Sequence, residues 1–157
     1  MSTLVVRQRS WRPALLAWAI EVRGQPYVWG ETDCGALVCK ALRLQFGVEL
    51  FAALPPWSSA RSALRAWGVL LKEAGGGYAT LLSRMGATEV RGRVRGRWPM
   101  GTILISREDV GPLPALGIYV DPIVVQSDQE CGVQWSDPST ADIESAWLFE
   151  QVVLNHG

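Results

Sequence analysis

Histidine is almost missing from this chain of 157 residues, because the only one, His156, is next to last. Histidine is the usual proton carrier of enzymes at neutral pH, so its scarcity limits the chemistry that the chain can perform. The three cysteines are also few: Cys34 and Cys39 have four residues between them, and Cys131 stands alone. This spacing suits neither a disulfide framework nor a zinc site. We expect no metal and no cofactor.

Long apolar runs are missing as well. No stretch reaches the ~18 residues of a membrane span, because Arg, Glu, Pro or Gly interrupts every candidate. The first residues, Met-Ser-Thr-Leu-Val-Val-Arg, lack the charged start and the long apolar middle of a signal peptide. We therefore expect no membrane span, no signal peptide, and a protein made and kept in the cytoplasm unless something else exports it.

The chain has no excess charge of either sign, since 15 basic residues balance 15 acidic ones. This balance argues against general nucleic-acid binding. The charges are nevertheless split: residues 1–107 hold all fifteen Lys and Arg, and residues 108–157 hold nine acidic residues. Such a molecule can dock against neighbours through complementary fields. One short stretch is expected to be a solvated basic loop and contains Arg84, Arg91, Arg93, Arg95 and Arg97.

Apolar material is plentiful, at 48% hydrophobic and only 19% charged residues. A chain of this length most simply forms one domain over residues 1–157. Eight tryptophans are several times the usual share. We expect most of them in the core, but tryptophan is also enriched in interfaces, so the excess favours an obligate partner.

The first half of the chain has helical periodicity. Thr32 or Asp33 is the expected N-cap of the second helix, and Gly47 is expected to end it. The predicted helices cover residues 12–23, 34–46 and 60–73, with a short helix near 78–85. Their expected buried stripes are Leu15, Trp18, Ala19 and Val22; Leu37, Val38, Ala41, Leu42 and Gln45; and Leu64, Trp67, Leu70 and Leu71.

After residue 86 the pattern becomes that of short β-strands separated by Gly, Pro or Asp turns. The predicted strands cover residues 87–90, 101–106, 115–120, 123–126, 132–135 and 147–153. A run of helices followed by a run of strands indicates an α+β fold, with the helices packed on one antiparallel sheet. The helical part is about 10–86 and the β part about 87–155.

Cys34 has the position of a nucleophile, at the start of a predicted buried helix behind a tight loop. A helix N-terminus carries partial positive charge and free N–H groups, which stabilise a thiolate and bind an oxyanion. The same position also suits a small buried residue that merely begins a helix. The local pattern leaves both interpretations open.

The surrounding residues resemble the nucleophile segment of NlpC-type cell-wall peptidases, which are papain-like. That family has a Gly-x-Pro-Tyr-x-Trp-Gly loop leading into Asp-Cys-Ser-Gly-Leu-Val. Here the matching residues are Gly24-Gln25-Pro26-Tyr27-Val28-Trp29-Gly30 and Thr32-Asp33-Cys34-Gly35-Ala36-Leu37-Val38. The loop after Gly30 is shorter, and Gly35-Ala36 replaces Ser-Gly. The resemblance implies a papain-like fold, with Cys34 in the nucleophile position and Tyr27, Trp29, Asp33 and Gly35 along the cleft.

The second half resembles the same family in order, except at one position. Leu116–Val120 resembles the strand written His-Val-Gly-Ile-Tyr, and Gln126 falls at the third polar position of the triad. Ala115 falls where that family has its catalytic histidine, and alanine neither forms an ion pair with a thiolate nor protonates a leaving amine. Gln126 does not titrate near neutral pH. The stretch 48–100 has no clear counterpart.

Other groups are poor substitutes for the missing histidine. His156 lies beyond the last predicted strand, whereas a base must be held within about 3 Å of its nucleophile. Glu108, Asp109 and Asp121 lie near strand ends, but a carboxylate opposes a thiolate.

Ala115-Leu116-Gly117-Ile118 and Ala146-Trp147 are similar to a group of phage-encoded domains that keep the nucleophile segment. This resemblance implies a structural component of a phage tail tip or tail-like assembly, without catalysis. Its partners would be other tail-tip or baseplate proteins, and it would pass from the host cytoplasm into the virion tail. Two alternatives stay open: an active peptidoglycan-cleaving cysteine endopeptidase, and a non-catalytic module that binds cell-wall peptides.

Overall fold

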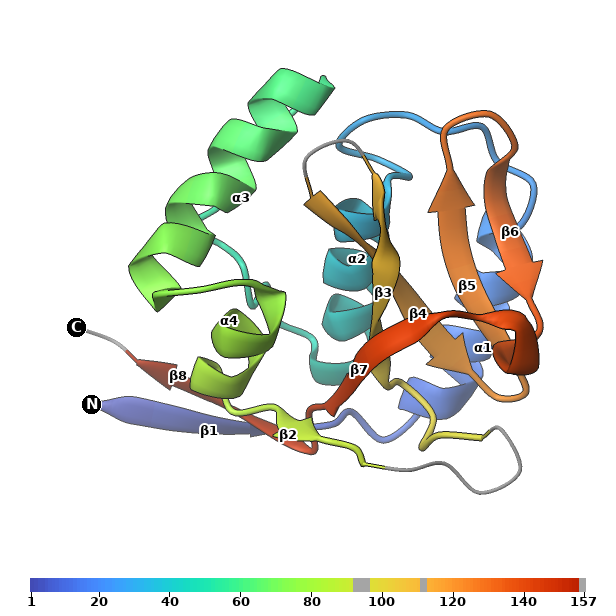
Figure 1. Cartoon of the computed structure of the whole chain (residues 1–157). Coiled ribbons are helices and arrows are strands. Elements are labelled where there is room, and N and C mark those ends of the chain that lie inside the picture. Colours follow the sequence, from blue (N-terminus) through green and yellow to red (C-terminus); the bar gives the residue numbers. More distant parts are fainter. Residues whose placement is uncertain (92–96, 111–112, 156–157) are drawn as a thin grey trace.

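The computed structural model describes residues 1–91, 97–110 and 113–155, and its fold is α+β, which confirms the expected class (Figure 1). The helices are α1 (Trp11–Val22), α2 (Cys34–Phe46), α3 (Ala60–Ala74), α4 (Tyr78–Arg84) and a 3-10 helix, η1 (Pro138–Thr140). The strands are β1 (Ser2–Val6), β2 (Thr88–Glu89), β3 (Ile103–Val110), β4 (Leu113–Val120), β5 (Ile123–Asp128), β6 (Gly132–Ser136), β7 (Ile143–Leu148) and β8 (Gln151–Asn155).

Six strands form one antiparallel sheet in the order β2-β7-β3-β4-β5-β6. Helices α1 and α2 pack against one face of this sheet, where α2 contacts β4 and β5. Helix α3 lies to one side and is connected through α4, which contacts β2 and β7 (Figure 1). No helix within the described ranges is both long enough and apolar enough to cross a membrane.

The predicted helices are confirmed to within a few residues at their ends. The N-cap of α2 is Asp33, whose side chain accepts a hydrogen bond from the backbone N–H of Ala36, and Gly47 ends the helix in a left-handed conformation. Helix α3 begins with a capping box between Ser59 and Ser62. These caps satisfy backbone N–H groups that a helix end otherwise leaves unpaired. Every expected buried residue of α1 and α2 is buried.

One position of the predicted α3 stripe is wrong. Leu64 is 42% exposed, whereas Ala63, Ala66 and Trp67 are buried. The buried face of α3 is therefore rotated toward its small residues, because the large Trp67 ring needs the close approach that alanine allows.

The strand predicted over 147–153 is in fact two strands in two different sheets. Leu148 and Phe149 are both buried, so the alternation of a single strand is broken there. Phe149 turns into the core against Phe46, with ring centroids 6.5 Å apart. The chain then continues as β8, which pairs with β1 in a separate two-stranded sheet. Strand β1 was not among the predicted elements.

The core has a large layer on the helix side of the sheet and a small cluster on the other face. The small cluster consists of Trp98, Leu104, Tyr119, Val124 and Ala146. The tryptophans fill these layers more completely than expected, since four are buried and the other four are half-buried.

An aromatic cluster formed by Phe51, Trp57, Trp67 and Tyr78 covers the first turn of α2. Trp67 is 2% exposed and meets Phe51, Trp57 and Tyr78 edge to face, with centroids 5.3, 5.8 and 5.5 Å away. The indole also lies against Gly35, where an added Cβ would be 2.9 Å from its Nε1. Gly35 therefore leaves the space that Trp67 occupies.

We predict that Trp67→Ala lowers the free energy of unfolding by about 3–5 kcal/mol, because it opens a cavity among aromatic rings that cannot collapse. Urea denaturation followed by far-ultraviolet circular dichroism measures this. Val69→Ala is the matched control on the same helix, since Val69 is 57% exposed and its loss should matter by less than about 0.5 kcal/mol. Equal effects of the two substitutions would contradict the prediction.

Candidate functional site

The carboxylate of Asp33 organises the loop that leads into α2. Its Oδ2 accepts hydrogen bonds from the backbone N–H of Gly30 and from Trp57 Nε1 at 2.9 Å, while Oδ1 accepts from Ala36 N at 3.1 Å. Asp33 is only 3% exposed. One side chain therefore closes the loop, caps the helix and fastens the segment before α3, which is a tertiary role that the sequence pattern did not reveal.

The remainder of the loop is held from two sides. Thr32 Oγ1 accepts from Val28 N and donates to the carbonyl of Pro26, both at 2.7 Å. At the other end, Gly24 and Gln25 exchange backbone hydrogen bonds with Val133 of β6, both at 2.9 Å. Hydrogen bonds therefore fix the start of the loop to the sheet and its end to α2.

Cys34 is the first residue of α2 and packs into the helix-side core. Burial raises the pKa of its thiol to about 11, and the neighbouring carboxylate of Asp33 adds to this rise. Backbone hydrogen bonds from Leu116, Gly35 and Cys34 itself lower the pKa but do not offset the burial. The thiolate, which is the nucleophile, is therefore a minute fraction near neutral pH.

The bond between Cys34 and the backbone of Leu116 places the nucleophile position beside β4, one residue from Ala115. Ala115 and Gln126 line a common pocket of about 350 Å³. Cys34 is not among the described residues that line this pocket. Along β4, Leu116 and Ile118 belong to the helix-side core, so the alternating Ala115 points to the other face of the sheet.

Gln126 has a partner of its own, because its Nε2 donates to Ser136 Oγ at 2.6 Å. Two of the carboxylates considered from the sequence, Glu108 and Asp109, line the same outer pocket. Asp121 accepts a hydrogen bond from the hydroxyl of Tyr119 at 2.6 Å. His156 lies outside the described residues.

Of the expected cleft residues, Asp33 and Gly35 adjoin Cys34 in the chain, and Tyr27 interacts with it electrostatically. Tyr27 and Trp29 meet edge to face with centroids 5.0 Å apart. Burial raises the pKa of Tyr27, and the negative charges of ionised Cys34 and of Asp33 raise it further. The Tyr27 hydroxyl is buried without a hydrogen-bond partner among the described atoms. Gly35 is buried beneath Trp67.

Sequence reasoning missed Tyr78 and Ser127. Tyr78 is electrostatically coupled to Cys34, and burial raises its pKa. Ser127 Oγ on β5 is buried and has no hydrogen-bond partner within the described ranges. Helical periodicity predicted the burial of Trp67, but for Trp57 and Tyr78 the sequence offered only the excess of aromatic residues.

The described residues hold no group of three or more His, Cys, Asp or Glu side chains suited to a metal ion. All three cysteines are free. In the predicted basic loop, Arg84, Arg91 and Arg97 are exposed, and Arg91 pairs with Glu89 at 3.0 Å. Arg93 and Arg95 lie outside the described residues.

A family model described as a domain of unknown function, DUF6950, matches residues 6–148. The chain belongs to this family, since the match covers nearly all of α1 to β7 and the elements between them. The matched range includes residues 48–100, so the aromatic cover of α2 is part of the family domain. No curated protein matches the chain.

We predict that Asp33→Asn lowers the free energy of unfolding by about 2–3 kcal/mol. The amide keeps one acceptor for the helix cap but loses the charge that strengthens the bonds from Gly30 and Trp57. Thermal and urea unfolding measure the loss. Asp137→Asn is the control, because Asp137 caps η1 at the surface through Ser139 and should matter much less. A larger effect at Asp137 would contradict this role of Asp33.

We predict that the alkylation rate of Cys34 stays low near pH 7 and keeps rising beyond pH 10. The thiol reacts as its thiolate, and burial has moved the pKa up to about 11, so deprotonation comes only in strong base. Iodoacetamide labelling followed by peptide mass spectrometry measures the rate, with exposed Cys131 as internal reference. A rate that persists well below pH 8 would contradict the prediction.

Proposed function

We propose that the chain is a structural component of a phage tail tip or a tail-like assembly, built on a papain-like, NlpC-type fold that has lost catalysis. The observation that carries this proposal is the state of Cys34. It keeps the position of a nucleophile at a helix N-terminus, yet burial raises its pKa to about 11 and no imidazole stands beside it in the described residues.

Loss of the proton carrier affects both steps of amide cleavage. The base must take the thiol proton, and the resulting acid must protonate the leaving amine. The neighbours that interact with Cys34 are Asp33, Tyr27 and Tyr78. Asp33 is occupied by three hydrogen-bond donors, and the two phenols have raised pKa values. The raised pKa values keep both phenols protonated near pH 7, so neither accepts the thiol proton.

The arrangement of elements supports the NlpC-type resemblance. The loop that matches the family pattern leads directly into α2, and α2 packs on β4, the strand aligned with His-Val-Gly-Ile-Tyr. The proposed partners are other tail-tip or baseplate proteins. The protein would be in the host cytoplasm during assembly and in the virion tail afterwards.

A second candidate function is a module that binds cell-wall peptides without cleaving them. The pocket beside Ala115 and Gln126 favours it, because the outer face of the sheet there offers hydroxyl, amide and carboxylate groups to a peptide. In this case the positions of Ala115 and Gln126 would contact a bound peptide, and Cys34 would take no part.

We predict that the protein at high concentration does not clear a turbid peptidoglycan suspension, and that Cys34→Ala behaves identically. We also predict that antibodies against the chain label the tail tip of purified virions, and that Cys34→Ala virions keep their titre. Turnover abolished by Cys34→Ala would replace the proposal by the endopeptidase alternative. Absence from virions, combined with muropeptide binding that Gln126→Ala weakens, would replace it by the binding module.

A further inference from the structure

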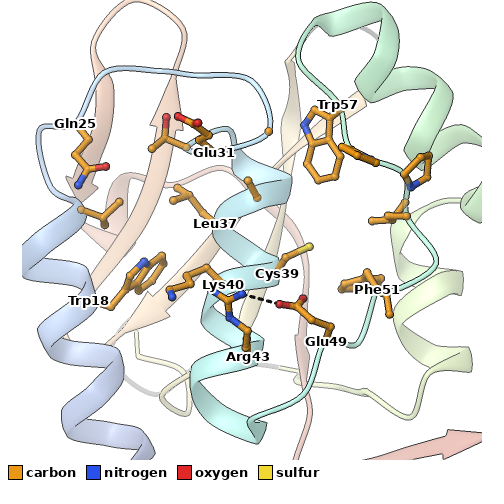
Figure 2. Close-up of a pocket in the computed structure, with 18 of the residues that line it drawn as sticks. Trp18, Gln25, Glu31, Leu37, Cys39, Lys40, Arg43, Glu49, Phe51 and Trp57 are labelled. Atoms are coloured by element: carbon orange, nitrogen blue, oxygen red, sulfur yellow. Dashed lines mark hydrogen bonds and ion pairs between the residues drawn. The ribbon is translucent and has the colours of Figure 1, made fainter.

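A groove of about 610 Å³ runs along the face of α2 that is turned away from the sheet, between α1 and the segment 49–57 (Figure 2). Its volume falls within the ~300–1,000 Å³ typical of ligand sites. Cys34 is not among the described residues that line it, so the groove is separate from the nucleophile position. Its existence does not depend on the role proposed above.

The groove has large apolar side chains on its two sides and its floor, with polar and charged residues between them. Figure 2 shows Trp18 on the α1 side, Leu37 on α2, and Phe51 and Trp57 on the opposite side. Pro55 and Pro56 also line the groove. Proline has no backbone N–H, and the backbone groups within α2 are bonded inside the helix, so an occupant cannot pair here as an added strand. Recognition must therefore rest on side chains.

The groove is held open before any ligand arrives. Trp57 Nε1 is bonded to the carboxylate of Asp33 at 2.9 Å, which fixes one wall to the start of α2. At the other end, Arg43 and Glu49 form an ion pair at 2.8 Å that closes the groove (Figure 2). A pre-formed groove needs little ordering on binding, which preserves affinity.

The length of the groove suits a peptide segment. From Ala36 to Arg43 it follows eight residues of α2. This is about 10 Å of helix rise, the length of an extended segment of about three residues. The groove is open to solvent along this length, so a chain can enter and leave it.

The charged residues that line the groove determine which kind of peptide it can bind. The charged residues that line the groove are Glu21, Glu31, Lys40, Arg43 and Glu49, and the pair Arg43–Glu49 neutralises itself. Lys40 lies midway along the groove and has no ion-pair partner within the described ranges. Glu21 and Glu31 are exposed on the side of α1 and the loop. An unpaired ammonium amid apolar walls favours a carboxylate flanked by apolar side chains.

We infer that this groove binds a short peptide segment of a partner protein in which one acidic residue, placed to pair with Lys40, stands next to large apolar residues. Long runs of negative charge are disfavoured by Glu21 and Glu31, so nucleic acids and polyacidic tails do not fit. The apolar side chains would lie against Trp18, Phe51 and Trp57.

The test uses a library of random linear peptides displayed on filamentous phage and selected against the whole chain. We expect enrichment of sequences with a single Asp or Glu beside large apolar residues. The enriched peptide is then synthesised with a fluorescent label, and its affinity is measured by fluorescence anisotropy. Replacing its acid by the corresponding amide should weaken binding about tenfold. No enriched pattern, or a pattern without an acid, would overturn the inference.

Two matched pairs of variants locate the site. The chain has two lysines, Lys40 in the groove and exposed Lys72 on α3, so Lys40→Glu should abolish binding while Lys72→Glu leaves it within about twofold. Ala52 and Ala53 are both exposed, but only Ala52 lines the groove, so Ala52→Glu should weaken binding and Ala53→Glu should not. Circular dichroism checks that each variant is folded. A further variant, Lys40→Met, removes the charge of the side chain while keeping its apolar stem. Equal affinities within both pairs would overturn the groove as the site.

Discussion

The carboxylate of Asp33 is the constraint on which the rest of this structure depends. It is buried, and a buried carboxylate is costly unless every acceptor position finds a donor. Three donors reach it: a backbone N–H of the loop, a backbone N–H of α2 and the indole of Trp57. One of these donors, Trp57, is 24 residues away from Asp33 in the chain. Satisfying one charge thereby sets the course of the loop, the start of α2 and the position of the segment before α3.

The same arrangement explains why the pKa of the Cys34 thiol is raised. A helix N-terminus alone would favour the thiolate. Here the half-buried residue packs against the helix-side core beside β4, and the adjacent carboxylate of Asp33 adds negative charge. Desolvation exceeds the help of the backbone donors, so the pKa moves up. The position of a nucleophile at a helix N-terminus is thus retained, while the surroundings favour the neutral thiol over the thiolate.

The segment between α2 and the sheet has two structural consequences. Its aromatic residues cover the first turn of α2 through Trp67, which packs against Gly35. Its preceding stretch, with Phe51 and Trp57, forms one wall of the groove along the outer face of α2. The segment therefore closes the site beside Cys34 and at the same time builds a new concave surface. Since it lies within the family match, both features belong to the domain itself.

Local physics made much of this protein predictable from its sequence. Helical periodicity with cap residues such as Asp33 and Gly47 located α1 to α4, and alternation with turn residues located most strands, because these signals act within a few residues of the chain. The lack of any histidine before His156 was likewise evident from the sequence alone. The tertiary structure alone decided the rest. Leu64 is exposed because Trp67 must approach α2 closely, and residues 147–153 divide because Phe149 turns toward Phe46. Three features arise from contacts between residues far apart in the chain: the pairing of β1 with β8, the burial of Cys34 and the groove beside Lys40. No local sequence pattern encodes such contacts.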